Sequence, residues 1–353
     1  MGDRPGPKLR AAVVGTGLIG GSILLRLHES GVDVIGWDPD AATRSEGRAR
    51  GVHFAEELTD AVRDRDVVFL CGPLPTLPET LHTAAKYAGD RCVFTDVGST
   101  KSAVASFSVE HGLTDLFVPG HPMAGTERAG LTAAMPALFE GAAWVLCPTL
   151  DGIEAFRMLV GLILDVFQAR VVPMSPAVHD SVVALSSHVP HLLAGSLAGA
   201  VAESDVRDAV LGLAAGSFRD GTRVAGTPAR RTADMLMDNR EQVLRQLREV
   251  SAFLHELSTA LQRYDVDALV EQYRYARGTR VALLDRDLHS FRRQFSLTGD
   301  RIEEVEYLLE LGAAGGYLTG CRVSDSAVEY AGHRPRPDAQ SPSPSPARRP
   351  AAD

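Results

Sequence analysis

The chain has 353 residues, a formal net charge of −9 and 45% hydrophobic residues. A chain of this length is too long for a domain with one ordinary hydrophobic core. It predicts two domains of about 150 residues each, plus a tail. No block of Lys or Arg offers a binding surface for phosphate backbones or anionic lipids. We therefore expect neither nucleic acid nor a membrane as a partner.

Cysteine usage and the first residues indicate a cytoplasmic protein without a metal site. The N-terminal ten residues lack the apolar core of a signal peptide, and glycines and Arg26 interrupt the first apolar run, 11–27. The cysteines have no metal-ligand spacing and are predicted to be reduced core thiols. They are Cys71, Cys92, Cys147 and Cys321.

Short Val-rich runs alternate with helix-like stretches from residue 10 to about 150. The predicted strands are Ala11–Val14, Val32–Trp37, Val67–Cys71, Cys92–Asp96, Leu116–Val118 and Ala142–Leu146. This alternation predicts βαβ units and a mainly parallel sheet. After about residue 175 the strand signals stop, and helical periodicity replaces them.

One long apolar stripe marks the second half of the chain. It belongs to a helix beginning near Asn239 and consists of Val243, Leu247, Val250, Leu254, Leu257 and Leu261. A second helix, from Asp267 to about Phe291, and an apolar helix around His191–Val201 cover part of this face. Packing within the chain is one way to cover the remainder; we favour a homodimer with interlocked helices.

A glycine-rich loop follows the first predicted strand and opens a helix. It has the sequence Gly15-Thr16-Gly17-Leu18-Ile19-Gly20. In such a loop Gly15 permits the tight turn, Gly17 lets the backbone approach a pyrophosphate, and Gly20 lets the helix pack close to the sheet. The helix that begins at Leu18 and Ile19 presents free N–H groups that favour this anion.

Asp38 lies about 20 residues past these glycines, at the end of the second predicted strand. A carboxylate there accepts hydrogen bonds from the 2′-hydroxyl of NAD and repels the 2′-phosphate of NADP. The fold class is therefore an α/β N-terminal Rossmann-type dinucleotide-binding domain followed by an all-α dimerisation and substrate domain. We place the NAD-binding domain at 9–174 and the helical domain at 175–300.

Two further segments follow these domains. Residues 301–332 form a short C-terminal segment without an assigned role, in which Ile302, Val305, Leu308 and Leu309 are spaced for one helix. Residues 333–353 are rich in Pro and Ser and are predicted to be a disordered tail.

Chemistry is expected in the loops beyond the carboxyl ends of the strands. Pro73 forms a stiff wall for the nicotinamide ribose, Ser99 and Lys101 share the next loop, and His121 follows a third strand. An imidazole with a pKa of about 6.5 can accept a hydroxyl proton as hydride leaves for NAD⁺. Ser99 would orient the same oxygen and Lys101 would attract a carboxylate. Each has a structural alternative: loop or helix capping for His121 and Ser99, and solvation for Lys101.

Five collinear motifs resemble the prephenate/arogenate dehydrogenase family of tyrosine biosynthesis. They run from Gly17-Leu18-Ile19-Gly20-Gly21-Ser22 through Asp96-Val97-Gly98-Ser99-Thr100-Lys101, His121-Pro122-Met123-Ala124-Gly125-Thr126-Glu127 and Ser187-His188-Val189-Pro190-His191 to Gly216-Ser217-Phe218-Arg219-Asp220-Gly221-Thr222-Arg223. The resemblance implies NAD-dependent oxidative decarboxylation of prephenate, a dicarboxylate, with aromatisation of its ring as the driving force and no metal.

The resemblance also implies roles for individual residues. His121 accepts the C4-hydroxyl proton, Ser99 assists it, and Arg223 holds a substrate carboxylate with a bidentate fork. His191 and its neighbour His188 lie along the substrate side chain. Asp220 and Glu127 tune the site.

Several alternatives remain open at this stage. A relative acting on arogenate or 4-amino-4-deoxyprephenate would share this scaffold. The β-hydroxyacid dehydrogenases use a Lys on second-domain helices, whereas this chain has no Lys after Lys101. A non-catalytic NAD-sensing protein would tolerate loss of Ser99, His121 and Arg223, yet all three are present. Pro228-Ala229-Arg230-Arg231 replaces an aromatic residue of many relatives, and a full regulatory ACT domain does not fit after residue 300.

Overall fold

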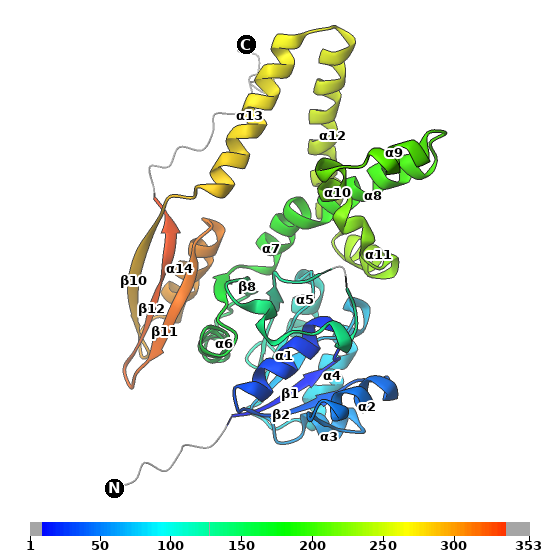
Figure 1. Cartoon of the computed structure of the whole chain (residues 1–353). Coiled ribbons are helices and arrows are strands. Elements are labelled where there is room, and N and C mark those ends of the chain that lie inside the picture. Colours follow the sequence, from blue (N-terminus) through cyan, green and yellow to red (C-terminus); the bar gives the residue numbers. More distant parts are fainter. Residues whose placement is uncertain (1–8, 127, 337–353) are drawn as a thin grey trace.

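The computed structural model describes residues 9–126 and 128–336 (Figure 1). Glu127 and the tail after residue 336, for which the sequence predicts disorder, lie outside the described residues. The described chain forms an N-terminal α/β domain, a helical region that projects from it, and a C-terminal strand-rich segment that returns to the N-terminal domain.

The first sheet is parallel, with the strand order β3-β2-β1-β4-β5-β6. Its strands are β1 (Arg10–Val14), β2 (Asp33–Trp37), β3 (His53–Phe54), β4 (Val67–Leu70), β5 (Val93–Asp96) and β6 (Phe117–Val118). The connecting helices are α1 (Leu18–Glu29), α2 (Ala41–Ala49), α3 (Leu58–Val62), η1 (Leu74–Thr76), α4 (Leu77–Tyr87) and α5 (Ser102–Glu110). Apolar residues fill both faces of the sheet, as a buried parallel sheet requires. The predicted α/β architecture is confirmed.

A second, mixed sheet has the order β10-β12-β11-β9-β8-β7. Its strands are β7 (Gly120–Pro122), β8 (Ala143–Leu146), β9 (Arg170–Pro173), β10 (Leu288–Ser296), β11 (Tyr317–Val323) and β12 (Ala327–Pro335). The helices η2 (Leu131–Ala133), η3 (Pro136–Phe139), α6 (Ile153–Asp165) and α14 (Arg301–Ala313) lie between these strands in the chain. Only β8 and β9 pair in parallel.

This second sheet corrects three expectations. Residues 142–146 do not join the parallel sheet, the helical region ends at Leu284 instead of residue 300, and β12 extends to Pro335, into the predicted tail. Charged residues such as Arg292 and Arg293 interrupt β10, so it lacks the apolar run that marked the earlier strands. The helix predicted within 301–332 is present as α14.

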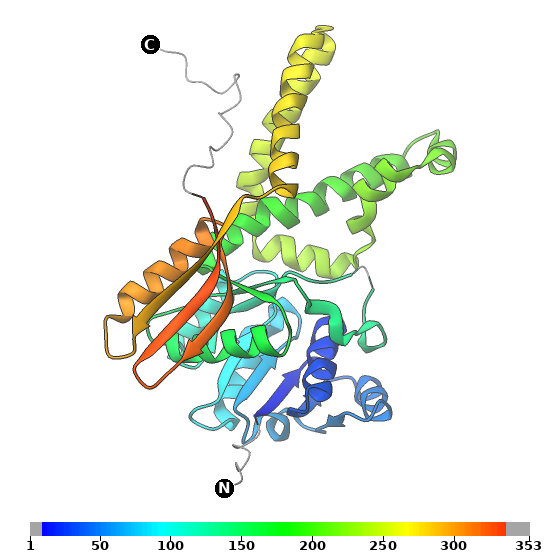
Figure 2. The same ribbon diagram turned by 60° about the vertical axis from the view of Figure 1, so that its left-hand side comes forward.

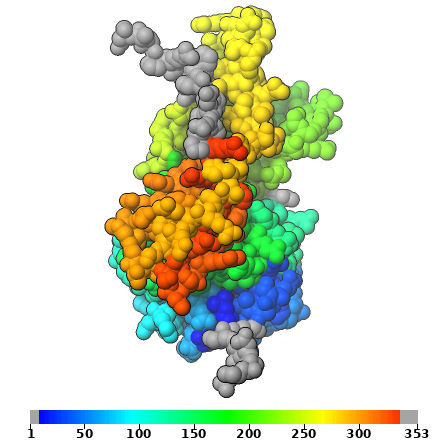
Figure 3. All heavy atoms as spheres, turned by 90° about the vertical axis from the view of Figure 1, so that its left-hand side faces the viewer, coloured from blue at the N-terminus to red at the C-terminus, as the bar shows by residue number. Residues whose placement is uncertain are grey.

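A buried polar cluster joins the C-terminal segment to the N-terminal domain. Arg157 on α6 donates to both carboxylate oxygens of Glu304 on α14, and the Tyr330 hydroxyl donates to Glu304 from β12 at 2.7 Å. All three side chains are buried. Figure 3 shows this segment, orange to red, lying directly against the N-terminal domain.

The helical region projects away from both sheets (Figure 2). It consists of α7 (Pro176–Val183), a π-helical turn η4 (Ala184–His188), α8 (Val189–Ala202), α9 (Arg207–Leu213), α10 (Gly216–Thr222), η5 (Arg223–Gly226), α11 (Ala229–Asp238), α12 (Arg240–Gln262) and α13 (Val266–Leu284). The long helix predicted from near Asn239 is confirmed as α12. The helix predicted to reach Phe291 ends at Leu284, and Phe291 lies in β10.

Large apolar side chains remain exposed along these helices, among them Leu197, Leu213, Leu254, Leu261, Val281 and Leu284. The continuous segment Pro176–Ala202 is long and apolar enough to cross a membrane by length and composition, and most of it is not buried within the chain. The same segment carries polar side chains that bind the N-terminal domain, described below. Its apolar outer face therefore belongs to a helix anchored to a folded domain.

Candidate active site

The glycine loop has the backbone that a dinucleotide site requires. Gly15 has a φ of +88°, and a Cβ on Gly20 would lie 1.9 Å from the Gly15 carbonyl oxygen. These two positions therefore accept no side chain without a shift of the backbone. A Cβ on Gly17 would meet no heavy atom within 4 Å. The space above Gly17 is open at the N-terminus of α1, where a pyrophosphate would lie.

Asp38 lies beside this loop and is held by its backbone. The Thr16 amide donates to Asp38 Oδ2 at 2.7 Å, and the Asp40 amide donates to Oδ1 at 3.0 Å. The Thr16 hydroxyl also donates to Oδ2 at 3.2 Å, so the acceptor capacity that remains for a ribose hydroxyl is the second lone pair of Oδ1. The residues present fit a dinucleotide with a free 2′-hydroxyl.

Asp96, at the end of β5, connects the Ser99 loop to the His121 strand. Its Oδ2 accepts from the Gly98 amide at 2.8 Å, and its Oδ1 accepts from the Gly120 amide at 3.0 Å. The Lys101 ammonium donates to the same carboxylate and to the Gly120 carbonyl. Lys101 is fully buried. The expectation that Lys101 binds a substrate carboxylate is therefore wrong, because the Lys101 ammonium is buried inside the domain in an ion pair with Asp96.

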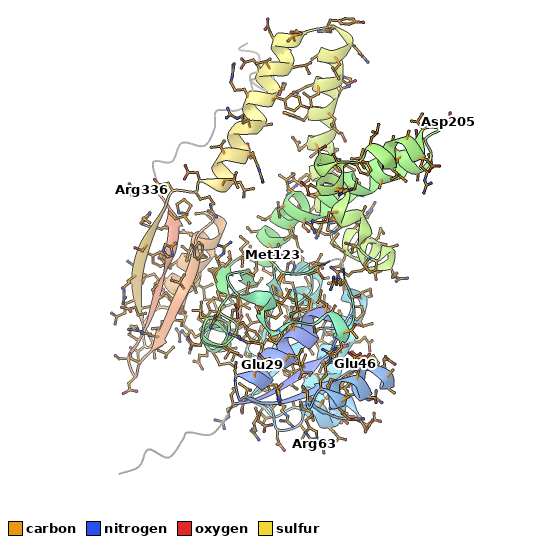
Figure 4. The ribbon with its side chains drawn as sticks, in the orientation of Figure 1. Glu29, Glu46, Arg63, Met123, Asp205 and Arg336 are labelled. Atoms are coloured by element: carbon orange, nitrogen blue, oxygen red, sulfur yellow. The ribbon has the colours of Figure 1, made fainter. Side chains whose placement is uncertain are left out.

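His121 is the first member of a chain of three side chains. Its Nδ1 lies 2.9 Å from His179 Nε2, and His179 Nδ1 lies 2.8 Å from Asp180 Oδ1. His121 lies on β7 and is partly exposed, whereas His179 and Asp180 are buried on α7. Figure 4 labels Met123, two residues after His121, where the N-terminal domain meets the helical region, and Asp205 at the far tip of the α8–α9 arm.

Electrostatics keep both imidazoles neutral. Burial holds the pKa of His121 well below its usual range, and His179, Lys101 and His188 act in the same direction. Burial also lowers the pKa of His179, against the opposing hydrogen bond to Asp180. Burial alone would raise the pKa of Asp180, but hydrogen bonds from His179 and Ser102 outweigh it and lower this pKa. At neutral pH His121 and His179 are therefore neutral, and Asp180 is an ionised carboxylate.

Asp180 also attaches the helical region to the N-terminal domain. Its two oxygens accept from the Lys101 and Ser102 amides at 2.8 and 2.9 Å, so its carboxylate caps the start of α5. The Thr100 hydroxyl donates to Asp238 of α11 at the same loop. This loop, which begins with Ser99, is thus fixed from the helical side by two carboxylates.

His188 is fully buried beside this chain. The Asn239 amide group donates to His188 Nδ1 at 3.1 Å and to the Asp180 carbonyl at 2.8 Å. Because Nδ1 accepts, the proton of the neutral ring is on Nε2, which has no hydrogen-bond partner among the described residues. Burial lowers the pKa of His188 to about 4. His188 is therefore an uncharged N–H donor, and it is near enough to His121 to affect the pKa of that imidazole.

The remaining predicted residues lie outside this network. Pro73 is exposed at the start of η1, and Ser99 is partly exposed with no hydrogen bond from its side chain to another described residue. His191 Nδ1 bonds to the Ser187 carbonyl at 2.9 Å. Asp220 and Arg223 are exposed on α10 and η5, which pack against α8. Among the described residues, the side chain of His121 hydrogen-bonds to His179 and to neither of these two. Glu127 lies outside the described residues.

Sequence reasoning missed His179, Asp180 and Asn239. His179-Asp180 is an adjacent pair in an apolar helix, which is a detectable but weak signal for an oriented imidazole. The sequence predicts Asn239 only as the start of a helix. None of these residues belongs to a predicted motif, and apart from the bond between His179 and Asp180 their partners are distant in the sequence.

Comparisons with known proteins agree with this geometry. Family models described as prephenate dehydrogenase, nucleotide-binding domain, and prephenate dehydrogenase, dimerization domain, match residues 23–172 and 175–275. A cyclohexadienyl dehydrogenase of Zymomonas mobilis is 32% identical over 278 residues, covering 77% of this chain and 95% of its own length.

Two solved structures share the fold over most of the chain. The Synechocystis arogenate dehydrogenase is 28% identical with a TM-score of 0.67, covering 78% of this chain and all of its own. Prephenate dehydrogenase from Aquifex aeolicus, solved in complex with hydroxyphenyl propionate and NAD⁺, is 26% identical with a TM-score of 0.72. It covers 79% of this chain and all of its own.

Proposed function

Because the chain belongs to the prephenate dehydrogenase family, we propose that it converts prephenate to 4-hydroxyphenylpyruvate and CO₂ with NAD⁺ as oxidant. The coarser activity follows from membership: the protein is an NAD-dependent oxidoreductase of the prephenate, arogenate and cyclohexadienyl dehydrogenase type. The observation that carries the proposal is the partly exposed imidazole of His121, which lies on the strand that Asp96 connects to the Ser99 loop and is kept neutral by burial.

Oxidative decarboxylation of prephenate requires a base for the C4-hydroxyl proton and binding groups for its two carboxylates. The glycine loop and Asp38 would hold NAD⁺, which would supply the acceptor for the hydride from C4 of the ring. His121 accepts the proton of the C4 hydroxyl, and Ser99, partly exposed in the neighbouring loop, orients that oxygen. The C1 carboxylate departs as CO₂, and its bonding electron pair completes the aromatic ring. The C4 oxygen then takes the proton back from the His121 imidazolium, which yields the phenol and returns His121 to its neutral form.

Arg223 is the proposed partner of a substrate carboxylate. Its guanidinium is exposed at the start of η5 and has no ion-pair partner among the described residues, unlike Arg230, which pairs with Asp234. An Arg fork binds a carboxylate through two parallel hydrogen bonds. His191, which is partly exposed, would contact the substrate's polar groups, and fully buried His188 would support the site from behind. Asp220, one helical turn before Arg223, and Glu127 are proposed to tune the same site.

A second copy of this chain is the proposed cover for the exposed apolar helices. The match to a dimerization domain over 175–275 includes most of these residues. A homodimer would bury side chains such as Leu254 and Leu261, which water otherwise contacts. A cytoplasmic location, which the sequence analysis predicts, belongs to the same proposal.

Turnover of purified protein tests the substrate directly. Prephenate, arogenate and 4-amino-4-deoxyprephenate are each offered with NAD⁺ while NADH absorbance is followed. We expect the highest kcat/KM for prephenate, because 4-amino-4-deoxyprephenate lacks the ring hydroxyl that His121 would deprotonate, and arogenate adds a side-chain ammonium beside the carboxylate that Arg223 would bind. A higher kcat/KM for either amine would transfer the function to that substrate, and no NADH from any of them would refute the proposal.

His121→Asn is the matched variant for this assay. Removal of a general base is expected to lower kcat about 10²–10⁴-fold. The Kd for NAD⁺, measured by calorimetry, should change little because His121 contacts neither the glycine loop nor Asp38. An unchanged kcat would exclude His121 as the base.

A further inference from the structure

Two buried residues outside every predicted site lie directly behind His121. His179 Nε2 is 2.9 Å from His121 Nδ1, and Asp180 Oδ1 is 2.8 Å from His179 Nδ1. The two imidazole planes are inclined at 73°, with ring centroids 5.1 Å apart. Both residues belong to α7 of the helical region, whereas His121 belongs to β7 of the second sheet.

The direction of each hydrogen bond follows from the carboxylate. Asp180 is ionised and can only accept, so His179 Nδ1 carries the proton. A neutral His179 ring then has a lone pair on Nε2, which requires His121 Nδ1 to donate. The proton of His121 is therefore on Nδ1, and its Nε2 is a bare lone pair. This is the tautomer that a general base needs on its substrate-facing nitrogen.

We propose that His179 and Asp180 are positioning residues that hold His121 in the tautomer and orientation of the general base. The assignment rests on the proposed function for its catalytic meaning, but the tautomer itself is a property of the protein without substrate. When His121 Nε2 takes the C4-hydroxyl proton, the imidazolium that forms keeps its Nδ1–H bond to His179. His179 remains hydrogen-bonded to Asp180, which stabilises the new positive charge without accepting a proton.

The other hydrogen bonds of Asp180 join the helical region to the N-terminal domain. The carboxylate accepts from the Lys101 and Ser102 amides as well as from His179. It is therefore fixed in place by the N-terminus of α5, in the loop that also carries Ser99. The orientation of His121 thus depends on contact between the N-terminal domain and α7.

Asp180→Asn alters the hydrogen bonds among Asp180, His179 and His121 with the least change in side-chain shape. The asparagine oxygen can still accept from the Ser102 amide at the place of Oδ2, while its NH₂ group, at the place of Oδ1, faces His179 Nδ1 and no longer accepts from the Lys101 amide. His179 then accepts at Nδ1 and donates from Nε2, which forces His121 to accept at Nδ1 and carry its proton on Nε2. In other enzymes the same replacement behind a catalytic histidine lowers kcat about 10⁴-fold. Here we expect a fall of about 10²–10⁴-fold in kcat, with KM and the Kd for NAD⁺ changed less than about threefold.

Asp238→Asn is the control. Asp238 accepts from Thr100 and fixes the same loop from the helical side, but it does not touch His179. We expect its kcat to stay within about threefold of wild type, because only loop docking is weakened. An equal loss in both variants would mean that Asp180 acts through loop docking alone, and would overturn the proposal.

Nitrogen chemical shifts of ¹⁵N-labelled histidine give the readout without substrate. We expect His121 and His179 as Nδ1–H tautomers in the wild type, and His121 as the Nε2–H tautomer in Asp180→Asn. His179→Gln, whose amide oxygen can still accept from His121, should retain more activity than His179→Leu. A wild-type His121 with its proton on Nε2, or no change in Asp180→Asn, would overturn the proposal. Failure to oxidise prephenate with these tautomers intact would refute only the proposed function.

Discussion

Buried neutral His188 makes the stability of this protein sensitive to acid. Its pKa is lowered from 6.5 to about 4 by burial, so the unfolded chain binds the proton more tightly than the folded chain. The stability gained from keeping His188 neutral is therefore complete above pH 6.5 and is lost as pH falls toward 4. With these two values, linkage gives a loss of about 2 kcal/mol between pH 7 and pH 5 from this one group.

The assay compares wild type with His188→Asn in urea at both pH values, followed by fluorescence of Trp37 and Trp144. Asparagine places an amide oxygen near the position of His188 Nδ1, so the hydrogen bond from Asn239 is retained without a titrating ring. Acidification should destabilise the wild type by about 2 kcal/mol more than the variant. An equal pH dependence in both proteins would refute the reasoning, since His188 would then titrate alike in the folded and unfolded chains.

Three further predictions concern the cofactor loop, the coenzyme and the C-terminal segment. Gly17→Ala should weaken NAD⁺ binding while leaving the melting temperature unchanged, because its Cβ meets only open space; Gly20→Ala should lower the melting temperature as well, and equal melting temperatures in the two variants would contradict this. Asp38→Gly should raise the ratio of kcat/KM for NADP⁺ over NAD⁺ by at least about tenfold, and an unchanged ratio would remove Asp38 from coenzyme selection. Arg157→Met should cost about 3–5 kcal/mol in urea unfolding by leaving Glu304 charged and buried, and adding Glu304→Gln should recover most of it; no recovery would show that packing, rather than charge, causes the loss.

The parts of the fold that the sequence predicts are those specified by neighbouring residues. The strand, glycine loop and helix from β1 to α1 are encoded within 20 residues, and the apolar stripe of α12 within 23. β10 to β12 obtain their pairing and burial from elements far away in the chain, so their local pattern is weak. Lys101 was misassigned for the same reason: a lysine in a polar loop is usually solvated, and only the fold places Asp96 beside it.

The site divides in the same way. His121 follows a predicted strand, so its place at the edge of the sheet could be predicted. His179 and Asp180 act on it from a helix that begins more than 50 residues later, and no periodicity indicates which face of that helix meets β7. The hydrogen-bond direction that makes His121 a base is therefore visible only in three dimensions.

The order of strands in the second sheet has a consequence for folding of the polypeptide during its translation. Val171 of β9 pairs with Leu318 of β11, so the ribosome must add the whole helical region before the partner of β9 emerges. Until then the nascent chain presents an unpaired strand edge beside exposed apolar helices, which is the kind of surface that aggregates or recruits chaperones. Release of a truncated polypeptide ending within α13 should therefore yield insoluble material, even though every residue of the Asp180–His179–His121 chain would already have been translated.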